Sequence, residues 1–446
     1  MPYPGHPFPQ THPDRLATVA TLFGLEPAPP DACRLLELGC GDGGNLVPMA
    51  YALPGSAFAG VDLSGTAVER AREFAAALAL ANLRLEHADL SALDLGEFDY
   101  VVAHGVYSWI APPERDALLA TCRAHLAPHG VAYVSYDVLP GGHLREITRQ
   151  MLRWHLREVT DPAERIAGAR GLLTAVADAR GHERLAAQAQ WALGQSDPAL
   201  FHDELAEHHE AVLFADFADH AARHGLRFLA EADVFEMQAS GLPEGLARDV
   251  IEREQYLDFF KGRMFRQTLL CRAEAEPREP AASVVRGMLA ASPVQRIGAD
   301  EFRAPRGTTL TTDDEAVKAA LVRLGEAWPA AVPVTELGGG DAVAEMLLRA
   351  YAADVVHLHV WAPPIATAAS ERPRAAAPAR FQATRGTRIT TLRHAEVDVP
   401  DELGRRLITL LDGTRDRAAL LRELGRPADE LERSLQGLAA LGLLER

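Results

Sequence analysis

The sequence predicts an α/β protein in which a seven-stranded sheet, interrupted by a helical insertion, is followed by a separate α+β region. Three observations lead to this fold class. Short apolar runs alternate with segments of helical length between residues 34 and 136, two more strand-like runs follow a long helical stretch, and a proline-containing linker precedes the last third of the chain. Alternating strands and helices are typical of a parallel sheet covered by helices.

The first five strands are predicted from five apolar runs, which read RLLEL, AFAGVDL, LRLEH, FDYVVAH and GVAYVSY. The segments between them have helical length or periodicity. Ala67, Ala71, Phe74 and Leu78, for example, recur at the spacing of one helix face.

The runs HGLRFLAE and FRQTLLCRA predict strands six and seven. We therefore expect the sheet domain to comprise residues 1–142 and 214–275, with residues 143–213 forming a helical insertion or lid. Open α/β sheets bind ligands beyond the carboxyl ends of their strands. An insertion after strand five lies above that edge, so it is a candidate cover for a substrate.

The segment EAEPREPAAS ends the first unit near Pro280. In residues 281–446, the stretch VKAALVRLGEAW to MLLRAYAADVVHLHV resembles LGRRLITLLDGT to LERSLQGLAALGLLER. Each is a helix, a short connection and a helix that runs into Leu- and Val-rich residues. We expect a tandem winged-helix-like region.

Composition narrows the classes of function. No apolar run reaches the roughly 18 residues of a membrane helix, and the four cysteines form no C-x-x-C pair, so neither zinc binding nor a disulfide framework is indicated. The N-terminus lacks the features of an export signal, and a cytoplasmic location is expected. The first 275 residues carry 23 Lys and Arg against 38 Asp and Glu, which disfavours nucleic acid and favours a basic partner.

A glycine-rich turn, LLELGCGDGGN, follows the first strand and precedes a helix. Gly39, Gly41 and Gly43 allow the backbone to turn tightly and to approach a ligand closely. The string also fits the dinucleotide fingerprint through Gly44, with Asp62 at a suitable distance for a ribose. The turn alone leaves NAD and S-adenosylmethionine open.

Three features favour S-adenosylmethionine. Glu37 places an acid at the end of strand one, where NAD-binding strands are usually apolar. Asp89 follows strand three in HADL, where it can contact an adenine edge. The order of elements gives a late pair of strands in place of a second nucleotide-binding half.

These motifs resemble those of the class I, Rossmann-like S-adenosylmethionine-dependent methyltransferases, over roughly residues 30–140 and 215–275. The resemblance implies that the glycines pass under the methionine moiety, that Asp62 binds the ribose, that Asp89 and Leu90 frame the adenine and that Glu37 holds the amino-acid end. The expected cofactor contacts are Glu37, Gly39, Gly41, Gly43, Asn45, Asp62, Leu63, Asp89, Leu90 and His104. No metal is expected.

A narrower resemblance rests on FPQTHPDRLA, AHGVYSW and EQYLDFFKGRMFRQTLLC. These segments look like those of bacterial methyltransferases that carry a methyltransferase regulatory domain. That group includes protein-lysine methyltransferases that modify outer-membrane proteins. The resemblance spans nearly the whole chain.

The loop after strand four reads His104, Gly105, Val106, Tyr107. Tyr107 is a candidate to hold an amine by a cation–π contact. His104 is a candidate proton acceptor, or it supports the cofactor. Trp109 and Tyr136 are candidates for an acceptor channel, although aromatic residues at strand ends often complete the core.

The cluster FHDELAEHHE, residues 201–210, predicts a solvated acidic lid helix, with an acidic funnel for lysine as the alternative. The function we expect is methyl transfer to lysine amines of a protein. A small-molecule N- or O-methyltransferase is the alternative, and a regulatory or scaffold protein that uses its winged-helix-like region is a third. The acceptor is expected to be basic.

Overall fold

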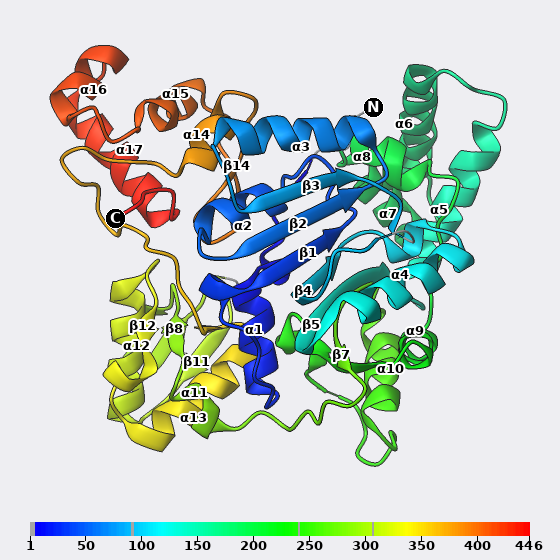
Figure 1. Ribbon diagram of the computed structural model, residues 1–446, viewed down its shortest axis with the longest axis horizontal. Coiled ribbons are helices and arrows are strands. Elements are labelled where there is room, and N and C mark those ends of the chain that lie inside the picture. Colours follow the sequence, from blue (N-terminus) through cyan, green and yellow to red (C-terminus); the bar gives the residue numbers. More distant parts are fainter. Residues whose placement is uncertain (1–4, 91–92, 240, 306) are drawn as a thin grey trace.

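A computed structural model describes residues 5–90, 93–239, 241–305 and 307–446, and its centre is one seven-stranded sheet (Figure 1). The strands are β1 Arg34–Leu38, β2 Ala57–Asp62, β3 Leu83–His87, β4 Phe98–Ala103, β5 Leu126–Asp137, β6 Leu226–Glu231 and β7 Phe265–Arg272. They lie in the order β3-β2-β1-β4-β5-β7-β6. All seven were predicted from the sequence, and the fold class is confirmed.

The first five strands pair in parallel, and β7 runs antiparallel between β5 and β6. The late pair of strands thus closes the sheet with a hairpin-like edge. Parallel strands bring their carboxyl ends to one edge. The loops after β1, β2, β4 and β5 meet there.

Helices cover both faces of the sheet, because successive side chains of a strand point to opposite sides. One face packs against α1 Pro13–Leu22, α2 Leu46–Ala52 and α3 Gly65–Ala77. The other packs against α4 Pro112–His125 and α9 Phe214–Arg223. Leu35 and Tyr133 belong to the first face, and Leu36 and Tyr136 to the second.

The insertion between β5 and α9 has a small core of its own. Its helices are α5 Gly142–His155, α6 Pro162–Asp178, α7 Glu183–Leu193 and α8 Asp197–Ala199, followed by a π-helical turn Leu200–Glu204. In Figure 1 these helices lie to the right of the sheet, and the C-terminal region lies to its left.

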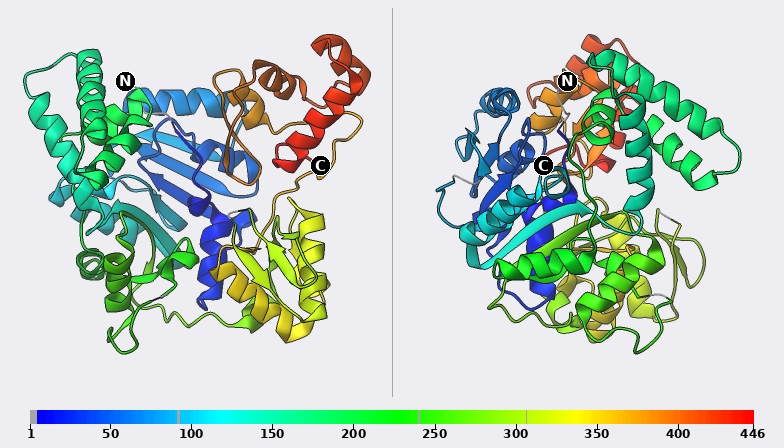
Figure 2. Two further views of the ribbon diagram at one scale, coloured as in Figure 1. Left: turned by 180° about the vertical axis from the view of Figure 1, so that it is seen from behind. Right: turned by 90° about the vertical axis from the view of Figure 1, so that its right-hand side faces the viewer.

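The C-terminal region consists of two halves, seen as a yellow group and an orange-to-red group in Figure 2. The first contains α11 Ala282–Val285, β8 Leu289–Ala291, β9 Gln295–Arg296, β10 Glu301–Arg303, β11 Thr309–Thr311, α12 Glu315–Ala327, β12 Val332–Pro333, α13 Gly340–Ala352 and β13 His357–His359. The second contains α14 Ala377–Ala383, β14 Arg388–Thr390, β15 Glu396–Asp398, α15 Glu402–Leu410, α16 Arg417–Leu424 and α17 Ala428–Ala440.

Both halves are tied to the sheet domain by specific contacts. The Asp14 carboxylate accepts the backbone N–H of Trp361 at 2.8 Å and lies 2.7 Å from His359 Nδ1. In the second half, the Phe381 ring stacks on Phe74 with 4.5 Å between centroids. The C-terminal region is therefore docked against the helices that surround the glycine turn.

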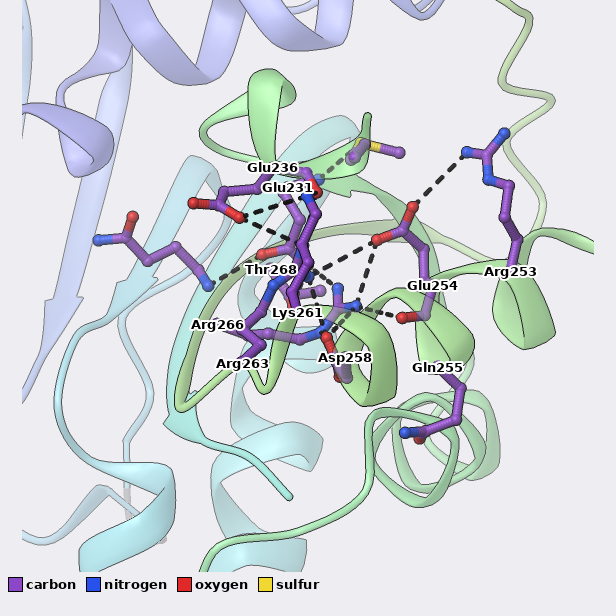
Figure 3. Close-up of polar contacts among 12 residues, drawn as sticks. Glu231, Glu236, Arg253, Glu254, Gln255, Asp258, Lys261, Arg263, Arg266 and Thr268 are labelled. Atoms are coloured by element: carbon purple, nitrogen blue, oxygen red, sulfur yellow. Dashed lines mark hydrogen bonds and ion pairs between the residues drawn. The ribbon is translucent and has the colours of Figure 1, made fainter. Parts of the chain in front are cut away.

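A buried ion cluster fixes the late part of the sheet (Figure 3). Arg266 on β7 is fully buried and pairs with Glu231 on β6 and with Glu254 and Asp258 on α10 Val250–Lys261. Arg263 adds a second guanidinium 3.1 Å from Asp258. Buried charges require such partners, because each is costly to remove from water.

The described part of the chain contains no helix that is both long and apolar enough to cross a membrane. The four cysteines are all buried free thiols.

Candidate active site

A cavity of about 1290 Å³ opens at the carboxyl edge of the sheet. One end is lined by the glycine turn and the ends of β1 and β2. The other end is lined by residues of the helical insertion, among them Arg145, Gln188 and Trp191. The insertion therefore covers the edge at which a parallel sheet binds its ligands.

The glycine turn has the backbone that its residues predict. Gly39, Gly41 and Gly43 have φ values of +79°, +52° and +76°, a region that side chains rarely adopt. A Cβ built on Gly41 would meet no atom within 4 Å. Gly41 also lines the cavity, so its bare backbone forms a cradle that a ligand can approach and that a side chain would fill.

Asp62 braces this turn from the end of β2. Its Oδ2 accepts the backbone N–H of Gly41 at 2.8 Å, and its Oδ1 accepts that of Ser64 at 2.7 Å. The carboxylate lines the cavity with lone pairs left over for further donors. This geometry suits a pair of ribose hydroxyls.

Glu37 lies at the end of β1 and is almost fully buried. Asn45 Nδ2 donates to its Oε1 at 2.7 Å, while Oε2 has no hydrogen-bond partner among the described residues. Burial raises the pKa of Glu37 to about 7. A buried carboxylate oxygen without a donor at the wall of a cavity fits a cationic ligand group such as the ammonium of S-adenosylmethionine.

The N-terminal segment forms a roof over this end of the cavity. The backbone N–H of Phe8 donates to Asn45 Oδ1 at 2.9 Å, and the Phe8 ring stacks on His104 with 3.6 Å between centroids. Gly5, His6 and Phe8 all line the cavity. An apolar ring at this position excludes water from this end of the cavity.

His104 lines the cavity beyond the end of β4, and its Nδ1 lies 2.8 Å from the Tyr133 hydroxyl. Burial, with a smaller contribution from His6, lowers the pKa of His104 to about 3. The imidazole is neutral at pH 7 and is a weak base there. This environment favours the interpretation of His104 as a support for the cofactor over that of a proton acceptor.

Two residues expected on the acceptor side lie elsewhere. Tyr107 and Tyr136 are buried in the second face of the sheet, and neither is among the described residues that line the cavity. Tyr136 stacks on Phe217 of α9, and the Tyr107 hydroxyl lies 2.9 Å from His220 Nδ1. The period of two along β5 directs Tyr136 toward α9 and away from the insertion.

Of the remaining residues that were expected to contact the cofactor, some line the cavity and others do not. Asn45 lines the cavity, whereas Gly43, Leu63, Asp89 and Leu90 are absent from its described lining. Leu63 is 72% exposed, and the side chain of Leu90 packs against the second-face core. Gly43 is enclosed, since a Cβ there would lie 2.8 Å from Val47.

The end of the cavity away from the glycine turn is built around Asp137, the last residue of β5. His209 Nε2 donates to its Oδ2 at 2.7 Å, and Arg145 lies 2.8 Å from the same oxygen. The guanidinium of Arg145 also lies over two indole rings, 5.1 Å from Trp109 and 5.5 Å from Trp191. Burial opposes ionisation of Asp137, but His209 and Arg145 outweigh it and hold its pKa below the usual value.

Sequence reasoning named Trp109 but missed Asp137, Arg145 and Trp191. An acid at the end of a buried strand was the available signal for Asp137, because the same reasoning had selected Glu37 and Asp62.

The structure corrects the expectation of a solvated helix over residues 201–210. The segment is a π-helical turn followed by irregular chain, and the side chains of Glu204 and His209 are fully buried. Pairing with Arg145 and Asp137 draws them inward.

Three families match this chain. They are described as a methyltransferase domain, at residues 36–132, a predicted methyltransferase regulatory domain, at residues 196–272, and a PKMT C-terminal winged helix domain, at residues 371–439. The first covers the glycine turn, β2, β3 and β4, together with parts of β1 and β5. The second covers the end of the insertion with β6, α10 and β7.

Relatives resemble different lengths of the chain. The uncharacterized protein RP789 of Rickettsia prowazekii is 36% identical over 61% of this chain, which spans only 52% of that protein. The uncharacterized protein RP028 of the same organism is 32% identical over 51% of this chain and 95% of its own length. The structure of PKMT2 from Rickettsia typhi in complex with AdoHcy covers 99% of this chain and 100% of its own at a TM-score of 0.89 and 24% identity.

The sheet order, the glycine turn and the matched domains define a class I methyltransferase that uses S-adenosylmethionine. Within this class, the chain belongs to the family that carries a methyltransferase regulatory domain and a PKMT-type winged helix domain.

Proposed function

We propose that this chain transfers methyl groups from S-adenosylmethionine to lysine amines of a protein. The observation that carries the proposal is one continuous cavity, which runs from the glycine turn to aromatic rings and carboxylates contributed by the sheet domain and by the insertion. The match to a PKMT C-terminal winged helix domain supports it.

The contacts of Arg145 indicate what the acceptor end can hold. Its cationic head is held by Asp137, Glu204 and the faces of Trp109 and Trp191. A lysine ammonium is attracted by the same carboxylates and ring faces. A basic acceptor entering this box must displace or join Arg145.

When bound, S-adenosylmethionine supplies an electrophilic methyl group on a sulfonium. We assign to Glu37, Asn45, Gly41 and Asp62 the binding of the cofactor, and to Trp109 and Asp137 the orientation of the amine. The residues 143–213 act as the lid that excludes water. Positioning an unprotonated amine near the methyl carbon accounts for most of the acceleration that such a displacement needs.

The test uses purified full-length protein, isotope-labelled S-adenosylmethionine and a bacterial lysate as the source of acceptors. Labelled protein is hydrolysed in acid, and the expected product is labelled methyl-lysine. Label confined to small molecules, or protein label that is lost in mild base as from methyl esters, would contradict lysine methylation.

Matched glycine variants connect the labelling to the cavity. Gly41→Ala places a methyl group in the cradle and is expected to abolish labelling. Gly425→Ala is the control, because Gly425 has a similar φ of +65° and equally open space but ends α16 far from the cavity. An equal loss of labelling in both variants would show that backbone strain, and not the filled cradle, causes the effect.

A second candidate is N- or O-methylation of a small molecule. Arg70, Arg145 and Arg184 line the cavity, and guanidinium groups bind carboxylates well. The same labelling experiment separates the two, because this candidate gives labelled metabolites from a lysate depleted of protein. We propose a cytoplasmic location for either activity, consistent with four free thiols.

A further inference from the structure

A cluster of two histidines and one aspartate lies on the second face of the sheet domain, outside the cavity. His220 lies on α9, His224 follows one turn later as the residue that caps this helix, and Asp116 faces both from α4. The Nε2 atoms of the two histidines lie 2.8 and 3.0 Å from Asp116 Oδ1. We propose that these three side chains bind a divalent transition-metal ion, with Zn²⁺ as the best fit.

The donor set is typical of zinc. Zn²⁺ takes imidazole nitrogens at roughly 2.0–2.1 Å and carboxylate oxygens at roughly 2.0–2.2 Å, usually with four ligands. The three donor atoms already lie within 4.8 Å of one another, so an ion between them requires only small side-chain shifts. Asp116 is 61% exposed, which leaves the fourth position open to water.

The ring of His220 is oriented before any ion arrives. The Tyr107 hydroxyl lies 2.9 Å from Nδ1 of His220, on the side of the ring opposite Asp116. Metal-bound histidines usually make such a contact through their second nitrogen, which fixes the ring. A hydroxyl can donate or accept, so Tyr107 suits either tautomer of His220.

The charges around the cluster are compatible with a cation. The guanidinium of the neighbouring buried residue Arg115 pairs with Glu210 at 2.5 Å and lies over the ring of Tyr107. Arg223 is exposed on the same helix, where solvent screens its charge. The Asp116 carboxylate therefore meets no buried competitor for the two imidazoles among the described residues.

A metal here would join two segments that belong to different matched domains. Helix α4 follows the loop that carries Trp109, and α9 lies within the matched regulatory domain. Through Tyr107, the ion would stiffen the wall of the cavity next to Trp109. The proposal concerns metal binding alone and does not depend on which acceptor is methylated.

The experiment measures Zn²⁺ binding by the untagged full-length protein after treatment with a chelator and desalting. Calorimetry and competition with a fluorescent chelator are expected to give one Zn²⁺ per chain, and Co²⁺ is expected to give the visible absorption of a tetrahedral site. His224→Ala and Asp116→Asn should each weaken binding by more than about 100-fold, because loss of outer-sphere partners alone costs roughly 10- to 100-fold.

The double variant His129→Ala/His155→Ala is the control, since it removes two exposed histidines away from the cluster. It should bind Zn²⁺ like the unmodified protein. Far-ultraviolet circular dichroism establishes that every variant is folded, and both test positions are at least partly exposed. An unmodified protein that binds no Zn²⁺, or affinity unchanged by either test variant, would overturn the proposal.

Discussion

Replacing Arg266 by methionine tests whether its ion cluster holds the late strands in place. The side chain is fully buried and contacts three carboxylates, with separations of 2.6 Å to Glu231, 3.2 Å to Glu254 and 2.8 Å to Asp258. Methionine fills a similar volume but leaves these acids without their main cation. Arg263, 3.1 Å from Asp258, compensates only part of the loss.

The expected cost is about 4 kcal/mol at pH 8, within the roughly 3–5 kcal/mol for breaking a buried pair by removing one partner. Burial already raises the pKa values of Glu254 and Asp258 in the folded protein. Without Arg266 these values rise further, so the acids become protonated at higher pH. The deficit should therefore grow from pH 5 to pH 8, because ionised carboxylates are the unfavourable form in the variant.

Hydrogen exchange of α10 and β7 at several pH values measures the local opening free energy, which avoids treating a multi-domain chain as two-state. Arg253→Met is the matched control: its side chain is 35% exposed and lies 3.6 Å from Glu254, so we expect a loss below about 1 kcal/mol. Arg266→Met within 1 kcal/mol of the unmodified protein at pH 8, or a cost independent of pH, would refute the reasoning.

Four further predictions concern the cavity and the residues around it. Since burial raises the pKa of Glu37 to about 7, S-adenosylmethionine should bind about tenfold more weakly at pH 6 than at pH 8, as measured by calorimetry. The Glu37→Gln variant should bind the cofactor weakly, with an affinity that does not change with pH. A tenfold change of affinity retained in this variant would contradict the role of Glu37. The same variant should gain stability above pH 7, because a raised folded pKa makes Glu37 increasingly unfavourable as pH rises from 4.5 through 7. Asp137→Asn should lower kcat for methyl transfer at least tenfold with an unchanged cofactor Kd, and an equal loss of cofactor binding would place Asp137 outside the acceptor end. His394→Ala removes the donor 2.8 Å from Asn45 Oδ1 and should weaken cofactor binding several-fold, whereas the control His129→Ala should not. Equal cofactor affinities in the two variants would show that the C-terminal region does not contribute to cofactor binding.

Patterns with a short range in the chain carried the prediction of the fold. The seven strands each follow from a run of five to nine residues, and the glycine turn follows from backbone angles that only glycine adopts readily. Glu37 and Asp62 lie at the ends of their strands, and Gly41 lies in the turn after β1, all at the same edge of the sheet. All three line the cavity. These features depend on neighbours in sequence, so the sequence alone was sufficient for them.

The direction in which each side chain points was decided by tertiary structure. Tyr136 and Asp137 are adjacent on β5, yet Tyr136 faces α9 and Asp137 faces the cavity. A shift of one residue reverses the face, and strand ends are uncertain by that amount when read from a sequence.

Long-range pairing was likewise beyond the sequence. Asp137 meets His209 across 72 residues, and Asn45 meets His394 across 349. No local pattern specifies which distant polar group will satisfy a buried one; only the packing of the insertion and of the C-terminal region on the sheet selects the partner. The sequence by itself therefore determined the sheet, the cofactor turn and the class of chemistry, whereas the acceptor end and the link from the C-terminal region to the cofactor turn were decided by the folded chain.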